Sequence, residues 1–268
     1  MKNKIILLLL LFVNLTFSQV DLMSNTAQQI DSSQWEGARN RIKDQTTFIN
    51  INPTAENYFK RARLKGFLHD FKGGLEDLNM AAKLAPNQFD VYYYRGAFKE
   101  QLNQLNEALE DFTVAIKLKP EIKWAWHDRS LINISLKKFA DAEKDLEKAF
   151  ELDPDWDIAF FAKGRLYEEK NELENAIVFY KKTIKVNPKG YMAYNNIGHI
   201  YFRLKKYDLA IDYYTEAIKV FPKYFNAYRN RSDAKNAKKD FVGACEDLRI
   251  AGSLGDLKAE KFYIENCR

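Results

Sequence analysis

Residues 191–224, YMAYNNIGHIYFRLKKYDLAIDYYTEAIKVFPKY, contain two short stretches in which apolar and small residues recur at helical spacing. With Tyr191 as position 1, the first stretch uses positions 4, 8 and 11, and the second uses positions 17, 20, 24, 27 and 28. A turn is expected near position 15 and another at Pro222, because proline cannot continue a helix but opens a new turn well. The segment therefore predicts two helices joined by a turn.

The same pattern recurs along most of the chain with a period of 34 residues. All six prolines follow this period, apart from a first spacing of 33; they are Pro53, Pro86, Pro120, Pro154, Pro188 and Pro222. The copies therefore begin at Ala55, Phe89, Lys123, Asp157, Tyr191 and Phe225. Position 4 is aromatic in every copy, whereas positions 8, 20 and 27 hold small residues that let two helix backbones approach closely. One helix pair cannot bury its apolar face alone, so neighbouring pairs are expected to stack.

The whole-chain composition agrees with long helices. The 268 residues include only 11 Gly and 6 Pro, so turn residues are scarce and a large all-β fold is not expected. The net charge of +5 is modest and no basic cluster stands out, so nucleic acid is not an expected partner.

The repeat pattern resembles the tetratricopeptide-repeat family over residues 55–258, about three quarters of the chain. The resemblance implies an all-α fold, a right-handed α-solenoid of six helix-turn-helix repeats with a C-terminal capping helix. The repeats are expected at 55–88, 89–122, 123–156, 157–190, 191–224 and 225–258, and the capping helix at 259–268. In the cap, we expect Leu257, Phe262 and Ile264 to face inward. Residues 19–54 fit the pattern poorly, and Gln34–Phe48 are expected to form one helix that covers the first repeat.

Residues 1–18, MKNKIILLLLLFVNLTFS, have the pattern of a secretory signal peptide. Lys2 and Lys4 precede an apolar run, and Thr16 and Ser18 provide small residues before a mature start at Gln19. The alternative is an uncleaved anchor helix, but the apolar run is short for a membrane span. We therefore expect an exported protein, in the periplasm of a Gram-negative bacterium or secreted, with no membrane span in the mature chain.

Two positions vary together across the repeats. Every copy with Arg at position 7 has Asp at position 23, and the two other copies carry an aromatic residue there. The pairs are Arg61 with Asp77, Arg95 with Asp111, Arg129 with Asp145, and Arg231 with Asp247. We predict structural ion pairs, either between the two helices of one repeat or across to the next repeat.

Cys245 and Cys267 are the only cysteines. Export implies an oxidising space, so a disulfide that staples the capping helix is expected. The alternative is two unpaired thiols, with Cys245 serving as a small core residue.

The sequence contains no recognisable catalytic constellation. The three histidines, His69, His127 and His199, are far apart in a solenoid and belong to no motif with metal-ligand spacing. No nucleophile elbow, phosphate loop or dinucleotide fingerprint is present. We therefore expect no enzyme activity, no cofactor and no metal.

In the resembling family, first helices line a concave groove, largely through positions 2, 5, 6, 9, 12 and 13. Carried onto this sequence, the candidate groove residues are Tyr93 and Tyr94, then Trp124, His127 and Asp128, then Phe161 and Arg165, then Asn195, Asn196 and His199, and finally Arg229 and Asn230. Aromatic area beside amides and guanidinium groups suits recognition of an extended peptide. The alternative is ordinary packing between adjacent first helices.

These features predict a non-enzymatic protein–protein interaction module. It would bind a peptide or protein segment in the concave groove, as an envelope adaptor or assembly factor. The alternative is a structural or self-associating subunit of an envelope complex. A clamp for the C-terminal carboxylate of chaperones, known in some family members, is not expected, because Phe161 and Arg165 stand where that clamp needs Lys and Asn.

Overall fold

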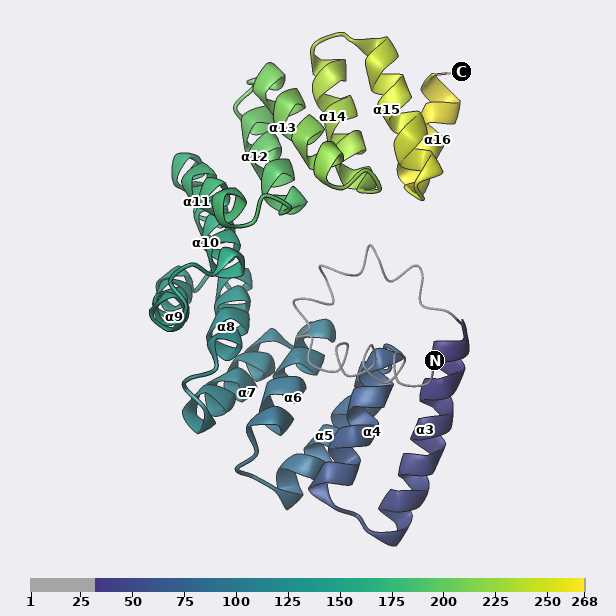
Figure 1. The fold of residues 1–268 in the computed structure, drawn as a ribbon, viewed down its shortest axis with the longest axis vertical. Helices are drawn as coiled ribbons and strands as arrows, with labels where there is room; N and C mark the ends of the chain where they lie inside the picture. The colour runs from purple at the N-terminus through teal and green to yellow at the C-terminus, as the bar shows by residue number, and fades with distance from the viewer. Residues whose placement is uncertain (1–31, 268) are drawn as a thin grey trace. The chain divides into compact units, whose positions relative to one another are not determined.

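The computed structural model describes residues 32–267, which form fourteen α-helices and no strand (Figure 1). The predicted signal peptide at 1–18 and the segment 19–31 lie outside the described residues. The chain divides into two compact units, with the boundary between Leu152 and Asp153. The predicted all-α helical-repeat fold is confirmed.

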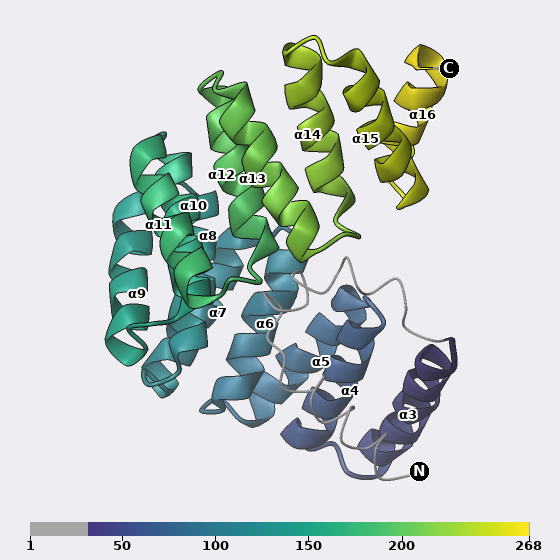
Figure 2. The same ribbon diagram turned by 45° about the horizontal axis from the view of Figure 1, so that its top comes forward.

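Unit 1 begins with α3, and its remaining helices come in pairs that pack in chain order. Its helices are α3 Ser32–Ile51, α4 Ala55–Phe67, α5 Phe71–Leu84, α6 Phe89–Gln101, α7 Leu105–Leu118, α8 Lys123–Ser135 and α9 Phe139–Leu152. Unit 2 contains three further pairs and a last single helix (Figure 2). Its helices are α10 Asp157–Glu169, α11 Leu173–Val186, α12 Tyr191–Arg203, α13 Tyr207–Val220, α14 Phe225–Ala237, α15 Phe241–Ser253 and α16 Leu257–Asn266.

The turn inside each helix pair has the same backbone conformation. Position 15 lies in the left-handed region in all six repeats, with φ between 57° and 66°, although none of these residues is glycine. The next backbone N–H then donates to the carbonyl five residues earlier, as Lys206 does to Tyr201 at 2.9 Å. This bond satisfies a carbonyl that the end of the first helix leaves free, so it ends that helix and starts the turn.

The two helices of a repeat touch where position 8 meets position 24. A Cβ built on Gly164 would lie 2.6 Å from the Tyr180 ring, and one on Gly198 would lie 2.8 Å from the Tyr214 ring. Only glycine leaves room for a buried tyrosine at such a crossing. In repeat 1 position 8 is Ala62, and position 24 is Leu78, which is smaller than tyrosine.

Four arginine–aspartate pairs link the two helices of their own repeat. Each arginine donates through Nε and Nη2 to both carboxylate oxygens of its aspartate, at 2.5–3.0 Å. The pairs are Arg61–Asp77, Arg95–Asp111, Arg129–Asp145 and Arg231–Asp247. A lysine also reaches the aspartate in three of these repeats, as Lys99 does to Asp111 at 2.7 Å. The bidentate geometry fixes how the two helices are placed along each other.

The other two repeats replace this polar cluster with paired aromatic rings. Tyr167 stacks on Phe179 with ring centroids 5.3 Å apart, and Tyr201 lies 5.5 Å from Tyr213. Both of these repeats, 4 and 5, belong to unit 2. They join their two helices at this place through apolar contact, whereas the other four repeats use an ion pair.

Helix α3 takes the place of a preceding second helix at the start of unit 1. Its Thr46 accepts a hydrogen bond from Arg61 Nη1 at 3.1 Å, as Thr113 of α7 does from Arg129. The helix spans Ser32–Ile51 and is therefore longer at both ends than the expected Gln34–Phe48. Trp35 stacks on His69, with ring centroids 6.0 Å apart.

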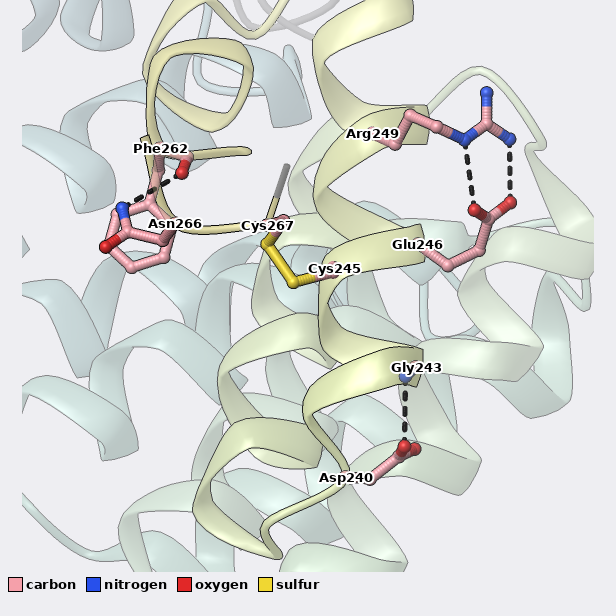
Figure 3. Close-up of a disulfide and its surroundings, with 8 residues drawn as sticks. All are labelled: Asp240, Gly243, Cys245, Glu246, Arg249, Phe262, Asn266 and Cys267. Atoms are coloured by element: carbon pink, nitrogen blue, oxygen red, sulfur yellow. Dashed lines mark hydrogen bonds and ion pairs between the residues drawn. A yellow bond between two sulfur atoms is a disulfide. The ribbon is translucent and has the colours of Figure 1, made fainter. Parts of the chain in front are cut away.

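At the other end of the chain, α16 is joined to α15 by a disulfide between Cys245 and Cys267 (Figure 3). The helix begins at Leu257, two residues before the expected start, because Asp256 caps it by accepting from the backbone N–H groups of Lys258 and Ala259. Arg229 pairs with the same aspartate at 2.8 Å.

The expectation that Leu257, Phe262 and Ile264 face inward is wrong. All three are exposed, Leu257 to 76%, whereas Ala259 is buried and Tyr263 and Cys267 pack on α14 and α15. The inward stripe of α16 is thus narrow, because it presents one alanine and one tyrosine where a wider apolar face was predicted. The disulfide adds a covalent link to this narrow contact.

Removing the disulfide should loosen α16 before the rest of unit 2. Loop-closure entropy for 22 residues predicts that reduction lowers the free energy of unfolding by about 3 kcal/mol. Hydrogen exchange with and without a dithiol measures this, and residues 257–266 should lose protection first. A Cys245→Ser/Cys267→Ser variant is the control, because it should behave like the reduced protein and ignore the dithiol. Unchanged protection of α16 on reduction would contradict the assignment.

Candidate binding surface

The candidate residues lie on the first helices of the repeats. We call the side-chain surface of α4, α6 and α8 the first-helix face of unit 1, and that of α10, α12 and α14 the first-helix face of unit 2. Adjacent first helices contact one another within each unit, through α6 with α8 and α12 with α14. The structure therefore gathers the predicted residues on two surfaces, one in each unit.

Three of the predicted residues in unit 1 are buried. The Tyr93 hydroxyl donates to Asp128 Oδ2 at 2.5 Å, and His127 Nδ1 lies 2.7 Å from Asp128 Oδ1. All three side chains are less than one tenth exposed. Burial, together with the neighbouring Asp128 carboxylate, raises the pKa of the Tyr93 hydroxyl well above its ordinary value. The expectation that these residues are open to a ligand is wrong, because they form the packing between α6 and α8.

The accessible part of the unit 1 face is aromatic and cationic. Tyr94 is half-buried and meets Phe59 edge to face, with ring centroids 5.3 Å apart. The Arg63 guanidinium lies over both rings, 5.5 Å from the Tyr94 centroid. Trp124 is also half-buried, and its ring meets that of His127 edge to face. These rings offer apolar area beside a cation, which suits an apolar or aromatic side chain of a partner.

The unit 2 face is built from linked amides. Asn230 Nδ2 donates to Asn195 Oδ1 at 2.9 Å, and so joins α14 to α12. Asn196 Nδ2 donates to the Tyr180 hydroxyl at 3.2 Å, and that hydroxyl donates to Glu168 Oε2 at 2.9 Å. Asn195 is buried, whereas Asn196 and Asn230 are partly exposed. The hydrogen bonds therefore fix the orientation of these amide planes.

His199 and Arg203 flank Glu168, the one carboxylate of this hydrogen-bond network. Glu168 lies 3.3 Å from His199 Nδ1 and 3.6 Å from Arg203 Nη1. Burial alone would raise the pKa of the Glu168 carboxyl, but the hydrogen bonds from His199 and Tyr180 outweigh burial and hold the pKa below its ordinary value. Arg165 is exposed one turn before Glu168 on the same helix, α10. The face is therefore polar, and Arg165 and Arg203 supply positive charge near Glu168.

The last two predicted residues have structural neighbours as well. Phe161 is half-buried against Tyr180, with ring centroids 5.3 Å apart. Arg229 pairs with Asp256 and donates to Asn226 Oδ1 at 2.9 Å, so its guanidinium helps to hold the start of α16.

Sequence reasoning missed Phe59, Arg63, Glu168 and Arg203. They occupy positions 5, 9, 12 and 13, which are among the groove positions, so the position pattern itself could have identified them. Tyr180 lies on a second helix at a core position, and no sequence signal marks its hydroxyl as part of this face. Among residues 32–267, no three His, Cys, Asp or Glu side chains gather as they would around a metal ion. No described helix is long and apolar enough to cross a membrane.

Comparison with known proteins gives family-model matches in both units. Residues 125–155 and 191–224 each match a model described as tetratricopeptide repeat, and residues 164–205 match one described as TPR repeat. A search of curated proteins finds no match.

Solved structures with a similar fold cover most of the chain. A tetratricopeptide repeat protein from Parabacteroides merdae is 17% identical, covers 91% of this chain and 96% of its own, and has a TM-score of 0.73. Yeast Tom70 is 21% identical over 84% of this chain and 48% of its own, with a TM-score of 0.65. YrrB, described as a TPR protein with an unusual peptide-binding site, is 21% identical over 73% of this chain and 97% of its own, with a TM-score of 0.53. At these identities the likeness shows the fold alone.

The lowered pKa of Glu168 predicts an acid-sensitive contribution to stability. A carboxyl group whose pKa is depressed by folding stabilises the fold above its unfolded pKa, and this stabilisation is lost as the pH falls through the folded value. Glu168→Gln should therefore lower the free energy of unfolding by about 1 kcal/mol at pH 7 and by much less at pH 3. Chemical denaturation of both proteins at the two pH values measures the difference. An equal loss at both pH values would contradict the assigned role of the carboxylate.

Proposed function

Because the chain is a tetratricopeptide-repeat protein, and such repeats form protein–protein interaction modules, we propose that its first-helix faces bind an extended segment of a partner protein. The observation that carries this proposal is the linked set of amides on the unit 2 face. Asn196 and Asn230 are held in place from one side and are partly exposed on the other. An amide can both donate to and accept from a peptide main chain, so such side chains recognise an extended segment whatever its sequence.

Charge and aromatic area supply the selectivity in this proposal. Arg165 adds exposed positive charge to the unit 2 face, so acidic side chains of the partner are favoured there. In unit 1, Tyr94 and Trp124 offer aromatic area for an apolar side chain. YrrB carries a peptide-binding site on the same fold, which supports a peptide ligand here.

We place this binding function in the cell envelope, where the protein would act as an adaptor or assembly factor. The signal-peptide pattern of residues 1–18 supports export. The disulfide between Cys245 and Cys267 supports an oxidising compartment, because such bonds are rare in reducing ones. The helical-repeat fold is typically a non-catalytic scaffold, which agrees with a role in binding.

The test begins with photo-crosslinking in the cell from a residue placed at Arg165. A matched crosslinking residue at Lys181, exposed on second helix α11, is the control for non-specific capture. The crosslinked segment of the partner is then synthesised and titrated against the purified parent protein. Arg165→Ala/Asn196→Ala should weaken binding at least about tenfold, as expected for loss of two central contacts.

Lys181→Ala/Lys185→Ala serves as the control variant, because both lysines are exposed on α11. It should bind within about twofold of the parent, since its changes lie off the first-helix face. Circular dichroism checks that all variants keep the same helical content. Binding that is lost in the α11 variant and kept in the first-helix variant would contradict the proposal.

A second function, self-association as a structural subunit of an envelope complex, is favoured by exposed apolar residues on α3. Phe48 and Ile51 lie on this helix, the first that the structure describes, and are 59% and 78% exposed. Sedimentation would then show a mass that rises with concentration, and this rise would survive Arg165→Ala/Asn196→Ala. A constant monomer mass would remove this alternative.

A further inference from the structure

Two helix-pair turns of unit 2 bring four lysines together. Lys205 and Lys206 lie in the α12–α13 turn, and Lys238 and Lys239 lie in the α14–α15 turn, one repeat later. Figures 1 and 2 show both turns on the same edge of unit 2. Lys205, Lys206 and Lys238 line one open hollow together with Tyr207, Asp208 and Leu209. We call the four lysines and the exposed apolar residues beside them the lysine edge.

Positive charge on the lysine edge is only partly neutralised. Lys238 pairs with Asp208, and Asp240 caps α15 by accepting from the Gly243 N–H at 2.9 Å. All four lysines are exposed. Within residues 32–267, Lys205, Lys206 and Lys239 have no carboxylate within 4 Å. The edge therefore presents an excess of cations to solvent.

The turn conformation does not require lysine at its left-handed position. Lys205 and Lys239 have φ values of 59° and 66°, in the left-handed region that disfavours most residues with a Cβ. In repeats 2 and 4 the same position holds Asn103 and Asn171, and asparagine tolerates this conformation better. In repeat 3 it holds Lys137, which is followed by Lys138, so a lysine pair at this turn also occurs once in unit 1. The helix dipole favours a cation near the C-terminal end of a helix. It does not require two in succession, one of them in an unfavourable conformation.

Exposed apolar side chains accompany the lysines. Phe241 and Val242 follow Lys238, Lys239 and Asp240 directly, and they are 60% and 85% exposed. Leu209, in the hollow between the two turns, is 41% exposed. Single exposed apolar side chains are ordinary on a protein surface, but here they stand beside exposed lysines. At the surface of a bilayer, however, apolar side chains enter the acyl region while lysines stay with the headgroups.

We propose that the lysine edge binds an anionic lipid surface, so that unit 2 attaches peripherally to a membrane. Lysine suits this ligand, because its flexible stem and compact charge follow mobile headgroups, whereas arginine suits fixed bidentate partners. An acidic protein would instead be expected to meet planar guanidinium groups and buried aromatic anchors. The inference is separate from peptide binding, because these turns lie outside the first-helix positions of the proposed peptide site.

The test measures vesicle binding of the chain that starts at Gln19, the mature form that the sequence predicts. Flotation with vesicles containing about 30% phosphatidylglycerol is compared with flotation on phosphatidylcholine alone. The parent should bind the anionic vesicles at least about tenfold more tightly and should be released by about 0.5 M salt. Lys205→Gln/Lys206→Gln/Lys239→Gln should lose this preference. Phe241→Ser/Val242→Ser should weaken anionic binding while leaving net charge unchanged.

The matched control is Lys185→Gln/Lys189→Gln/Lys223→Gln, which removes the same charge from exposed lysines near the opposite turns. It should bind the anionic vesicles within about twofold of the parent. Equal binding of the parent to both kinds of vesicle would overturn the proposal, and so would an equal loss in the control. Tighter binding of the parent to poly-glutamate than to anionic vesicles would also overturn it, in favour of an acidic protein partner.

Discussion

Close contact between the two helices of each repeat is the constraint on which the rest of the structure depends. At that contact, position 8 of the first helix and position 24 of the second share one volume. A Cβ on Gly198 would lie 2.8 Å from the Tyr214 ring, so a large residue is possible at position 24 only because position 8 is glycine. In repeat 1 the larger Ala62 stands at position 8, and position 24 holds Leu78, which is smaller than tyrosine. The spacing between the two helices is thus kept, because a smaller residue at position 8 accompanies a larger one at position 24.

This exchange also determines what the first-helix face of unit 2 can offer. Because Gly164 is small, Tyr180 crosses the helix contact, and its hydroxyl reaches Asn196 and Glu168 on the first helices. The amides of the proposed peptide site are therefore oriented by a residue that belongs to the core. In unit 1 the equivalent contact pairs Gly96 with Phe112, which has no hydroxyl. The face there is instead joined by the buried Tyr93–Asp128 bond.

Much of the fold could be predicted from the sequence, because the constraints that produce it are local and repeated. The proline period, the helix pairs and the turn near position 15 depend on nearest neighbours, and the covariation of Arg95 with Asp111 reflects a direct contact.

The exposure of individual side chains was harder to predict. Tyr93 and Tyr94 are both tyrosines and are adjacent in sequence. Only Tyr93 is buried, because its side chain lies between two helices. The lysine edge was missed because its turns are 34 residues apart and no linear segment is strongly basic. In the capping helix the large apolar residues Leu257 and Phe262 were expected to face inward, but the helix instead buries Ala259 and packs Tyr263 against its neighbours.

A double-mutant cycle on Gly198 and Tyr214 tests the shared-volume account most directly. Gly198→Ala should destabilise the protein by overpacking, and Tyr214→Leu should destabilise it by leaving a cavity, each by about 2 kcal/mol. The double variant recreates the Ala62–Leu78 combination. The account predicts that its loss in unfolding free energy is at least about 1 kcal/mol smaller than the sum of the two single losses. Losses that add to within about 0.5 kcal/mol would show that the two positions do not share one volume, and would contradict the account.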